Sequence, residues 1–203
     1  MRQISYIILA IIFSTMVACT LKKTEPTVWV GPHLNDKSSK VCVILPFANS
    51  NLQEHKDNYP EASKTVRDSF ETAFLEVGHR VVERNMIDKL IAELEFSMSG
   101  LTEQLGIKVG KMFDADIVIF GTVKSYYRVI WGPIVFATVG FSIKAVDVET
   151  GVIIWKGDHT KTIFWDIFDV DSPASLARKV AKEIIASFLE RTTNHRIGYK
   201  ERG

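Results

Sequence analysis

The first nineteen residues limit the possible structures of this chain more than any other segment. Met1–Gln3 contains an arginine, and Ile4–Phe13 is apolar at all but one position. Small residues follow and lead to Cys19. A cationic start, an apolar run and a cleavage site in this order are typical of a secretory signal peptide. The apolar run is about half of the ~20 residues that a membrane-spanning helix needs, so we expect residues 1–18 to be removed.

The residues around the expected cleavage site predict a lipid anchor. Met16-Val17-Ala18-Cys19 resembles a lipobox, with methionine in place of the more usual leucine at its first position. Signal peptidase II requires this cysteine, because diacylglycerol is attached to its thiol before cleavage. At ~0.8 kcal/mol for each buried CH2, the acyl chains on Cys19 would hold the protein on a membrane permanently. Thr20 rather than aspartate favours the outer membrane, on its periplasmic face. The alternative at this stage is an ordinary secreted protein with a chance cysteine.

The charge and length of the mature chain indicate one neutral domain. Removal of 18 residues from 203 leaves 185, and the loss of Arg2 leaves 24 basic and 24 acidic residues. This balance gives no electrostatic footprint for nucleic acid. Residues 19–40 are mostly polar and predict a lipidated N-terminus and tether, although Val28–Val30 could dock onto the domain. We expect the domain to span residues 41–193, followed by a polar tail at 194–203.

Apolar periodicity within the domain predicts an α/β fold with the order β-α-β-α-α-β-β-β-α. The expected strands are 41–47, 79–83, 117–130, 134–148 and 152–162, and the expected helices are 60–78, 87–94, 105–113 and 173–188. One mixed sheet, partly parallel and ending in an antiparallel meander, would be covered by helices. Cys42 lies within the first apolar run, so we expect a buried and unreactive thiol.

The sequence shows no pattern that is typical of catalysis, a metal site or a cofactor site. The five histidines are scattered without metal-ligand spacing, and no serine lies in a Gly-x-Ser-x-Gly motif. Gly106 and Gly110 follow no strand and do not form a phosphate loop. Asp114 and Asp116 are interpreted as caps of the preceding turn. We therefore predict that the protein is not an enzyme, while the loop 48–59 lies where open α/β sheets bind ligands, with a solvated loop as the default interpretation.

Four segments resemble the CsgG family of curli-assembly lipoproteins, in the family's order. They are Val43-Ile44-Leu45-Pro46-Phe47-Ala48-Asn49, Arg80-Val81-Val82-Glu83-Arg84, the strand that follows Asp114-Ala115-Asp116, and the hairpin Val146-Asp147-Val148-Glu149-Thr150-Gly151 with Val152-Ile153-Ile154-Trp155. The resemblance implies an anticodon-binding-like α/β domain, shared by the TolB N-terminal domain and by LpoB-type activators of penicillin-binding proteins. It also implies oligomerisation.

The hairpins of this chain are shorter than those of the curli secretion channel. A spanning strand needs ~9–11 residues beyond its anchoring sheet, and residues 121–146 leave about six on each side. Residues 157–173 are too short for a second such hairpin. The hairpin tip is unusually apolar and is a candidate partner surface, with packing on the final helix or on Trp165 as the alternative. The candidate residues are Ile130, Trp131, Ile134 and Phe136.

We therefore expect a lipid-anchored periplasmic protein that acts by protein–protein contact, with an envelope partner or with itself. Its role would be structural or in assembly, in curli-like or polymer secretion. One alternative is a regulator of a peptidoglycan synthase, similar to LpoB, for which a tether of about 20 residues reaches at most ~70 Å. A secretion channel subunit is the less favoured alternative.

Overall fold

The computed structural model describes residues 24–31, 40–50, 61–93, 103–131, 134–166 and 172–200. The predicted signal peptide and Cys19 lie outside the described residues, as do residues 51–60, which make up most of the loop 48–59. From residue 41 onward the order of elements confirms the predicted α/β fold, with a two-residue strand, β3 (Ala48–Asn49), added after the first strand.

The strands form one mixed sheet in the order β1-β7-β6-β5-β2-β4, with β3 pairing on β5. At one end of the sheet, β2 (Val41–Ile44) runs parallel to both the edge strand β4 (Arg80–Val81) and β5 (Ile117–Trp131). The meander consists of β5, β6 (Ile134–Asp147) and β7 (Ile153–Asp166), which pair antiparallel. The predicted mixed sheet, partly parallel and ending in an antiparallel meander, is therefore confirmed.

Strand β1 (Thr27–Val30) belongs to the sheet and not to a tether. It pairs antiparallel with β7, with Thr27 opposite Asp158 and Val30 opposite Trp155. The apolar residue Val28 is buried against the core, while its neighbours Thr27 and Trp29 are exposed. Burial of this side chain and the backbone bonds to β7 explain why part of the predicted tether, residues 19–40, joins the domain.

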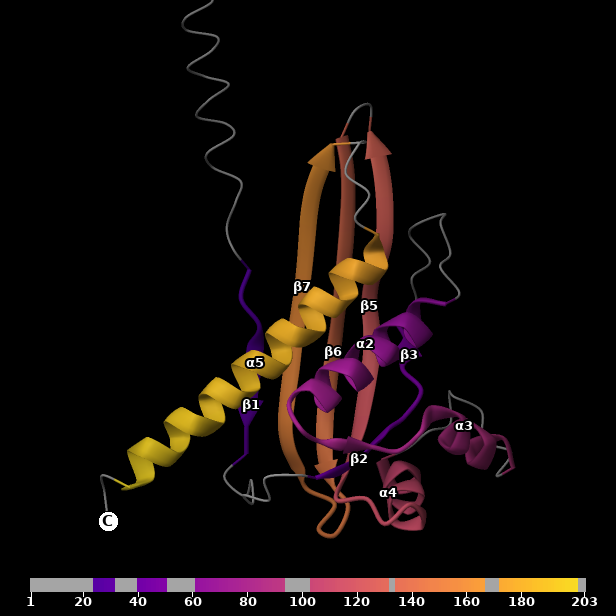
Figure 1. The fold of residues 1–203 in the computed structure, drawn as a ribbon, viewed down its shortest axis with the longest axis vertical. Helices are drawn as coiled ribbons and strands as arrows, with labels where there is room; N and C mark the ends of the chain where they lie inside the picture. Colours follow the sequence, from indigo (N-terminus) through magenta and orange to yellow (C-terminus); the bar gives the residue numbers. More distant parts are fainter. Residues whose placement is uncertain are drawn as a thin grey trace, which may run out of the picture.

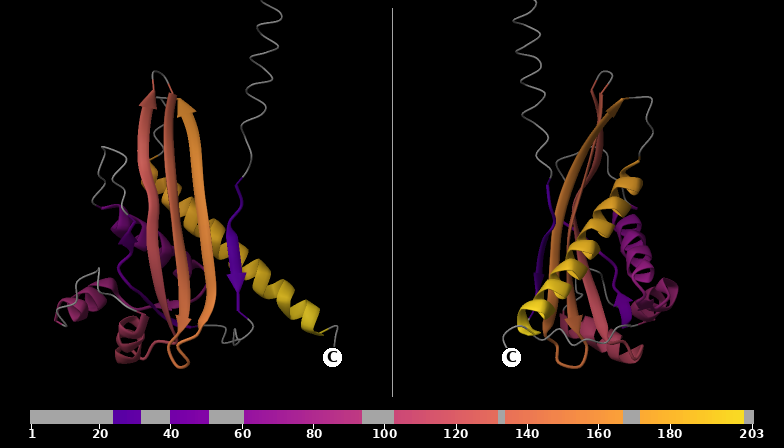
Figure 2. Two further views of the ribbon diagram at one scale, coloured as in Figure 1. Left: turned by 180° about the vertical axis from the view of Figure 1, so that it is seen from behind. Right: turned by 60° about the vertical axis from the view of Figure 1, so that its left-hand side comes forward.

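Two helices cover one face of the sheet, and the main core lies beneath them (Figures 1 and 2). The apolar stripe predicted for α2 (Ala62–Glu76) faces this core, from Ala62 to Phe74. Gly78 ends the helix as predicted. Its φ of 88° allows His79 N–H to donate to the Phe74 carbonyl, which closes a Schellman motif. The second helix, α5 (Pro173–Lys200), continues past residue 193, where the polar tail was expected to begin.

Two shorter helices cover only the lower end of the other face. These are α3 (Arg84–Glu93) and α4 (Glu103–Met112), which enclose a second core cluster around Val43, Leu45 and Val118. Helix α4 can approach the sheet closely because Gly106 and Gly110 carry no side chain at the contact. Within the described part of the chain, no helix lies over the rest of this face (Figure 2).

The three meander strands are long and extend beyond the helices (Figure 1). They contain 15, 14 and 14 residues, so β5 is ~50 Å long at ~3.3 Å per residue. The sequence pattern predicts an end of the last strand near Thr162, but β7 continues to Asp166, opposite Ile134. Residues 163–166 show no clear alternation of apolar and polar residues, and their backbone pairing with β6 extends the strand.

Candidate contact surface on the open face of the sheet

The candidate surface is the face of β5, β6 and β7 that lies opposite α2 and α5, and we call it the open face. Successive side chains of a strand point to opposite faces. On β6, Ala137, Val139 and Phe141 are fully buried in the core beneath α5. Their neighbours along the strand, including Phe136 and Ser142, therefore lie on the open face.

Three apolar residues lie side by side at the far end of the open face, and we call them the apolar patch. The strand register places Val129, Phe136 and Phe164 directly opposite one another. Phe136 and Phe164 are in edge-on contact, with ring centroids 4.8 Å apart and an interplanar angle of 77°. Val129 is nevertheless 42% exposed and Phe164 54% exposed. The opposite face of the same strands is covered, because Val135 and Ala137 are fully buried.

The structure separates the predicted partner residues between the two faces. Phe136 belongs to the apolar patch, whereas Ile130 pairs with the buried Val135 on the opposite face and is itself 63% exposed. Trp131 and Ile134 pair with each other at the hairpin end, and their side chains lie outside the described part of the chain.

Sequence reasoning missed two members of the apolar patch. It missed Phe164 because the strand was expected to end at Thr162, and it missed Val129 because the expected contact residues were those next to the turn. The aromatic residue Phe164, two positions beyond Thr162, was the signal that could have extended the strand.

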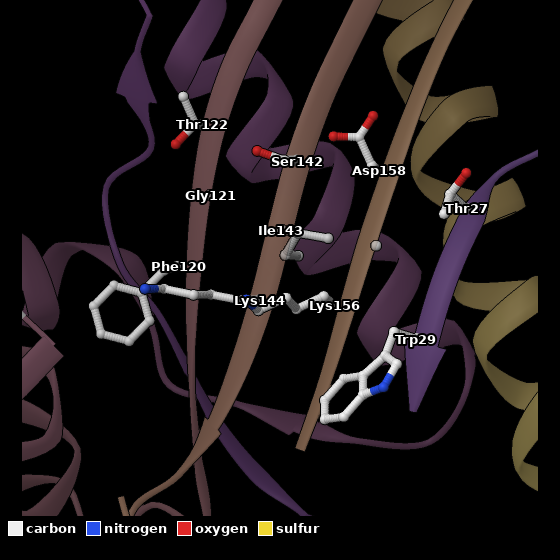
Figure 3. Close-up of a pocket in the computed structure, with 11 residues that line it drawn as sticks. Thr27, Trp29, Phe120, Gly121, Thr122, Ser142, Ile143, Lys144, Lys156 and Asp158 are labelled. Carbon is white, nitrogen blue, oxygen red and sulfur yellow. The ribbon is translucent and has the colours of Figure 1, made fainter. Parts of the chain in front are cut away.

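Below the apolar patch, the open face contains a hollow of about 490 Å³ between β1 and β5 (Figure 3). Two transverse rows of side chains line it. The lower row is Trp29, Lys156, Lys144 and Phe120, and the upper row is Thr27, Asp158, Ser142 and Thr122.

Two ion pairs within the chain involve residues that line the hollow, Lys144 and Asp158. Lys144 Nζ lies 5.0 Å from the centroid of the Phe120 ring and forms an ion pair with Glu103 of α4. Lys124 forms an ion pair with Asp158 across the strands. Because these charges are paired and partly exposed, the hollow offers a polar contact surface and no strongly charged binding site.

The residues singled out for possible chemistry have structural roles in the folded chain. Asp116 accepts a hydrogen bond from the Val41 N–H at 2.7 Å, so its carboxylate joins the start of β2 to the start of β5. Asp114 does end α4, with a φ of 50°. Burial raises the pKa of the Cys42 thiol to about 12, which agrees with the predicted unreactive core thiol.

Among the described residues, no group of histidine, cysteine and carboxylate side chains could hold a metal ion. No helix of the described residues is long and apolar enough to cross a membrane.

Comparison with known proteins identifies relatives in bacterial envelopes. The sequence model of the curli production assembly/transport component CsgG matches residues 13–132. No curated protein sequence matches significantly. The fold is similar to the PelC dodecamer from Paraburkholderia phytofirmans, with a TM-score of 0.50, 17% identity, and coverage of 80% of this chain and 94% of PelC. It is also similar to lipoprotein GNA1162 from Neisseria meningitidis, with a TM-score of 0.52, 15% identity, and coverage of 76% and 98%. At these identities the likeness concerns the fold alone.

Proposed function

The chain belongs to the CsgG family, whose model matches more than half of its length, and on this premise we propose that it is a lipid-anchored component of an envelope assembly or secretion system. It acts by protein–protein contact on the periplasmic face of the outer membrane, and the system secretes curli-like fibres or polymers. The predicted lipidation site is Cys19.

The observation that carries this proposal is the exposed apolar patch on the open face. Exposed aromatic side chains that adjoin one another favour a contact site over a solvated surface. On β6 the face beneath α5 is fully buried at Val135 and Ala137, whereas the open face presents the adjoining Val129 and Phe164 to solvent. Long strands that extend beyond the helices leave this patch accessible to a second body (Figure 1).

The occupant that we propose for the open face is a second copy of the chain. PelC, which shares the fold, is described as a dodecamer, and this supports self-association through the domain. The apolar patch would be buried in the contact between neighbouring subunits. The paired charges around the hollow would fix the orientation of one subunit relative to the next.

The test measures the oligomeric mass of full-length, lipidated protein in mild detergent. We expect Phe164→Glu to reduce the mass to that of a monomer, because a carboxylate in a buried apolar contact costs several kcal/mol. Ile130→Glu is the matched control, since Ile130 is 63% exposed, compared with 54% for Phe164, and lies in the same meander on the opposite face.

The outcomes separate the possible surfaces. If Ile130→Glu lost assembly and Phe164→Glu kept it, the contact would lie at the predicted hairpin tip and not at the apolar patch. If the wild-type protein were monomeric and bound an envelope partner through Phe164, the apolar patch would contact that partner and not a second copy of the chain. Conductance steps in liposomes would favour the channel alternative.

The anchor is tested separately. We expect mass spectrometry of the mature protein to find an N-terminal cysteine that carries acyl chains. We also expect Cys19→Ser to leave the membrane fraction after an alkaline carbonate wash. Retention of this variant in the membrane would contradict the lipid anchor and would require another explanation of residues 1–18.

A further inference from the structure

A second hollow, of about 510 Å³, lies between α2, α3 and the end of β2. Pro46 and Phe47 line it from the end of β2, and residues of both helices line it from the sides. β2 runs parallel to β4 on one side and to β5 on the other. α2 and α3 lie over opposite faces of the sheet. Open sheets bind ligands in the crevice at the carboxyl ends of such strands.

The wall of this hollow contains a buried arginine with an unused donor. Arg67 of α2 is only 4% exposed. Its Nε donates to the Ile44 carbonyl at 3.0 Å, and its Nη1 donates to Asp88 Oδ1 at 2.6 Å. Its Nη2 is buried and has no hydrogen-bond partner within the described residues. Buried donors are almost always paired, so this nitrogen indicates that an acceptor is missing from the site.

The charges that surround the hollow favour an anion as that acceptor. Lys64, Arg67 and Arg84 line it, against a single carboxylate, Asp88. Two of the cations also have partners behind the wall, since Arg84 forms an ion pair with Asp68 and Lys64 lies 3.4 Å from Glu61. Neither of these partners lines the hollow.

The start of α2 adds a partial positive charge at the same place. Ser63 and Lys64 belong to its first turn, which contains no acidic residue, and the N-cap residue Glu61 makes no side-chain cap. The N-terminus of a helix favours anions because its first N–H groups have no partner within the helix. The start of α3 is different, because Glu83 accepts a hydrogen bond from the Met86 N–H at 3.1 Å. The hydroxyl of Ser63 and the amide of Asn85 provide further donors on the wall.

We propose that this hollow, the Arg67 pocket, binds a phosphate group. Arg67 Nη2 donates to one phosphate oxygen, and Lys64, Ser63 and Asn85 bind the others. The Nη2 atom is covered, so part of the wall must move to admit the ligand. The proposal does not depend on self-association through the open face, which lies on other elements.

The test is calorimetric titration of the full-length protein in detergent with inorganic phosphate at low ionic strength. We expect saturable binding that weakens with added sodium chloride. Arg67→Lys should weaken binding at least tenfold, because the unpaired guanidinium nitrogen is lost. Lys64→Met should weaken it at least threefold and keeps the buried Arg67, so it remains informative if Arg67→Lys does not fold. Lys89→Met is the control, since Lys89 is an exposed lysine of α3 that does not line the pocket.

Two further probes define the ligand. Equal binding of acetate would overturn the choice of phosphate, whereas weaker binding of acetate supports it. Glycerol phosphate that binds more tightly than inorganic phosphate would indicate a lipid headgroup, and the reverse order would indicate the free ion. The proposal fails if the wild-type protein shows no saturable binding at millimolar phosphate, or if all three variants bind as the wild type does.

Discussion

Replacement of Gly110 by alanine tests whether α4 packs directly on the sheet. A Cβ atom at Gly110 would lie 2.5 Å from Val118 Cγ2 and 2.8 Å from Val148 Cγ2. Both valines are buried, and β-branched side chains have few alternative rotamers, so the helix must shift. With two contacts below 3.0 Å, overpacking should cost ~2–3 kcal/mol, the upper part of its usual range, and alanine regains ~1 kcal/mol over glycine within a helix. We expect a net loss of about 1–2 kcal/mol of unfolding free energy.

Gly106→Ala is the comparison within the same helix. Its Cβ would lie 2.4 Å from Phe120 Cζ and 2.9 Å from Leu45 Cδ1. The Phe120 ring is only half-buried and borders the hollow of the open face, so it can move away at lower cost. The loss should therefore be smaller than for Gly110→Ala.

Thermal unfolding followed by circular dichroism, with urea titration at 25 °C, measures both variants. For a domain of this size, 1–2 kcal/mol corresponds to a decrease in Tm of about 2–8 °C. If Gly110→Ala were as stable as the wild type or more stable, the higher helix propensity of alanine would outweigh any overpacking. The close contact of α4 with the sheet at Gly110 would then be refuted.

Three further predictions concern single side chains. Cys42, with its thiol pKa raised to about 12, should not react with thiol reagents at pH 8 until the protein is unfolded in urea, and rapid native labelling would contradict its burial. Burial, with a contribution from Lys40, lowers the pKa of His79 in the folded protein below its ordinary value of 6.5. Folding therefore favours neutral His79, and this contribution to the unfolding free energy is complete above pH 6.5. It is lost as the pH falls through the lower pKa of the folded state. His79→Asn keeps an acceptor for the Lys40 N–H and should remove this loss, which urea titrations at pH 7.5 and 5.5 would detect. Trp131→Asp, two residues from Val129 on β5, should leave the circular dichroism spectrum unchanged and abolish co-purification with a second, tagged copy of the chain, and unchanged pull-downs would exclude the hairpin tip from the contact.

The sequence predicted those features that depend on local patterns. Spacing of three and four residues placed the apolar stripe of α2, and Gly78 marked its end, because each signal lies within one helix. The predicted end of β7 was wrong, because residues 163–166 extend the strand through pairing with β6 and show no alternation of apolar and polar residues.

The features that the sequence did not predict depend on contacts between distant segments. Gly106 and Gly110 were considered only as a possible phosphate loop, and the close approach of α4 that they allow requires knowledge of Val118 and Phe120. Arg67 lies beside the stripe residue Val66, and periodicity alone cannot show that its guanidinium is buried against Ile44. The apolar patch likewise requires the register that brings Val129, Phe136 and Phe164 together.

The incorporation of β1 into the sheet fixes how far the domain can stand from its membrane. With acyl chains on Cys19, as proposed, only residues 20–26 separate the anchor from Thr27, which is paired with β7. Seven extended residues cover at most ~25 Å, compared with the ~70 Å that a free tether of about 20 residues would allow. Such a short tether keeps the folded domain close to the lipid surface, so that neighbouring copies lie in one plane. It gives the protein less reach than a synthase regulator working at the cell wall would need.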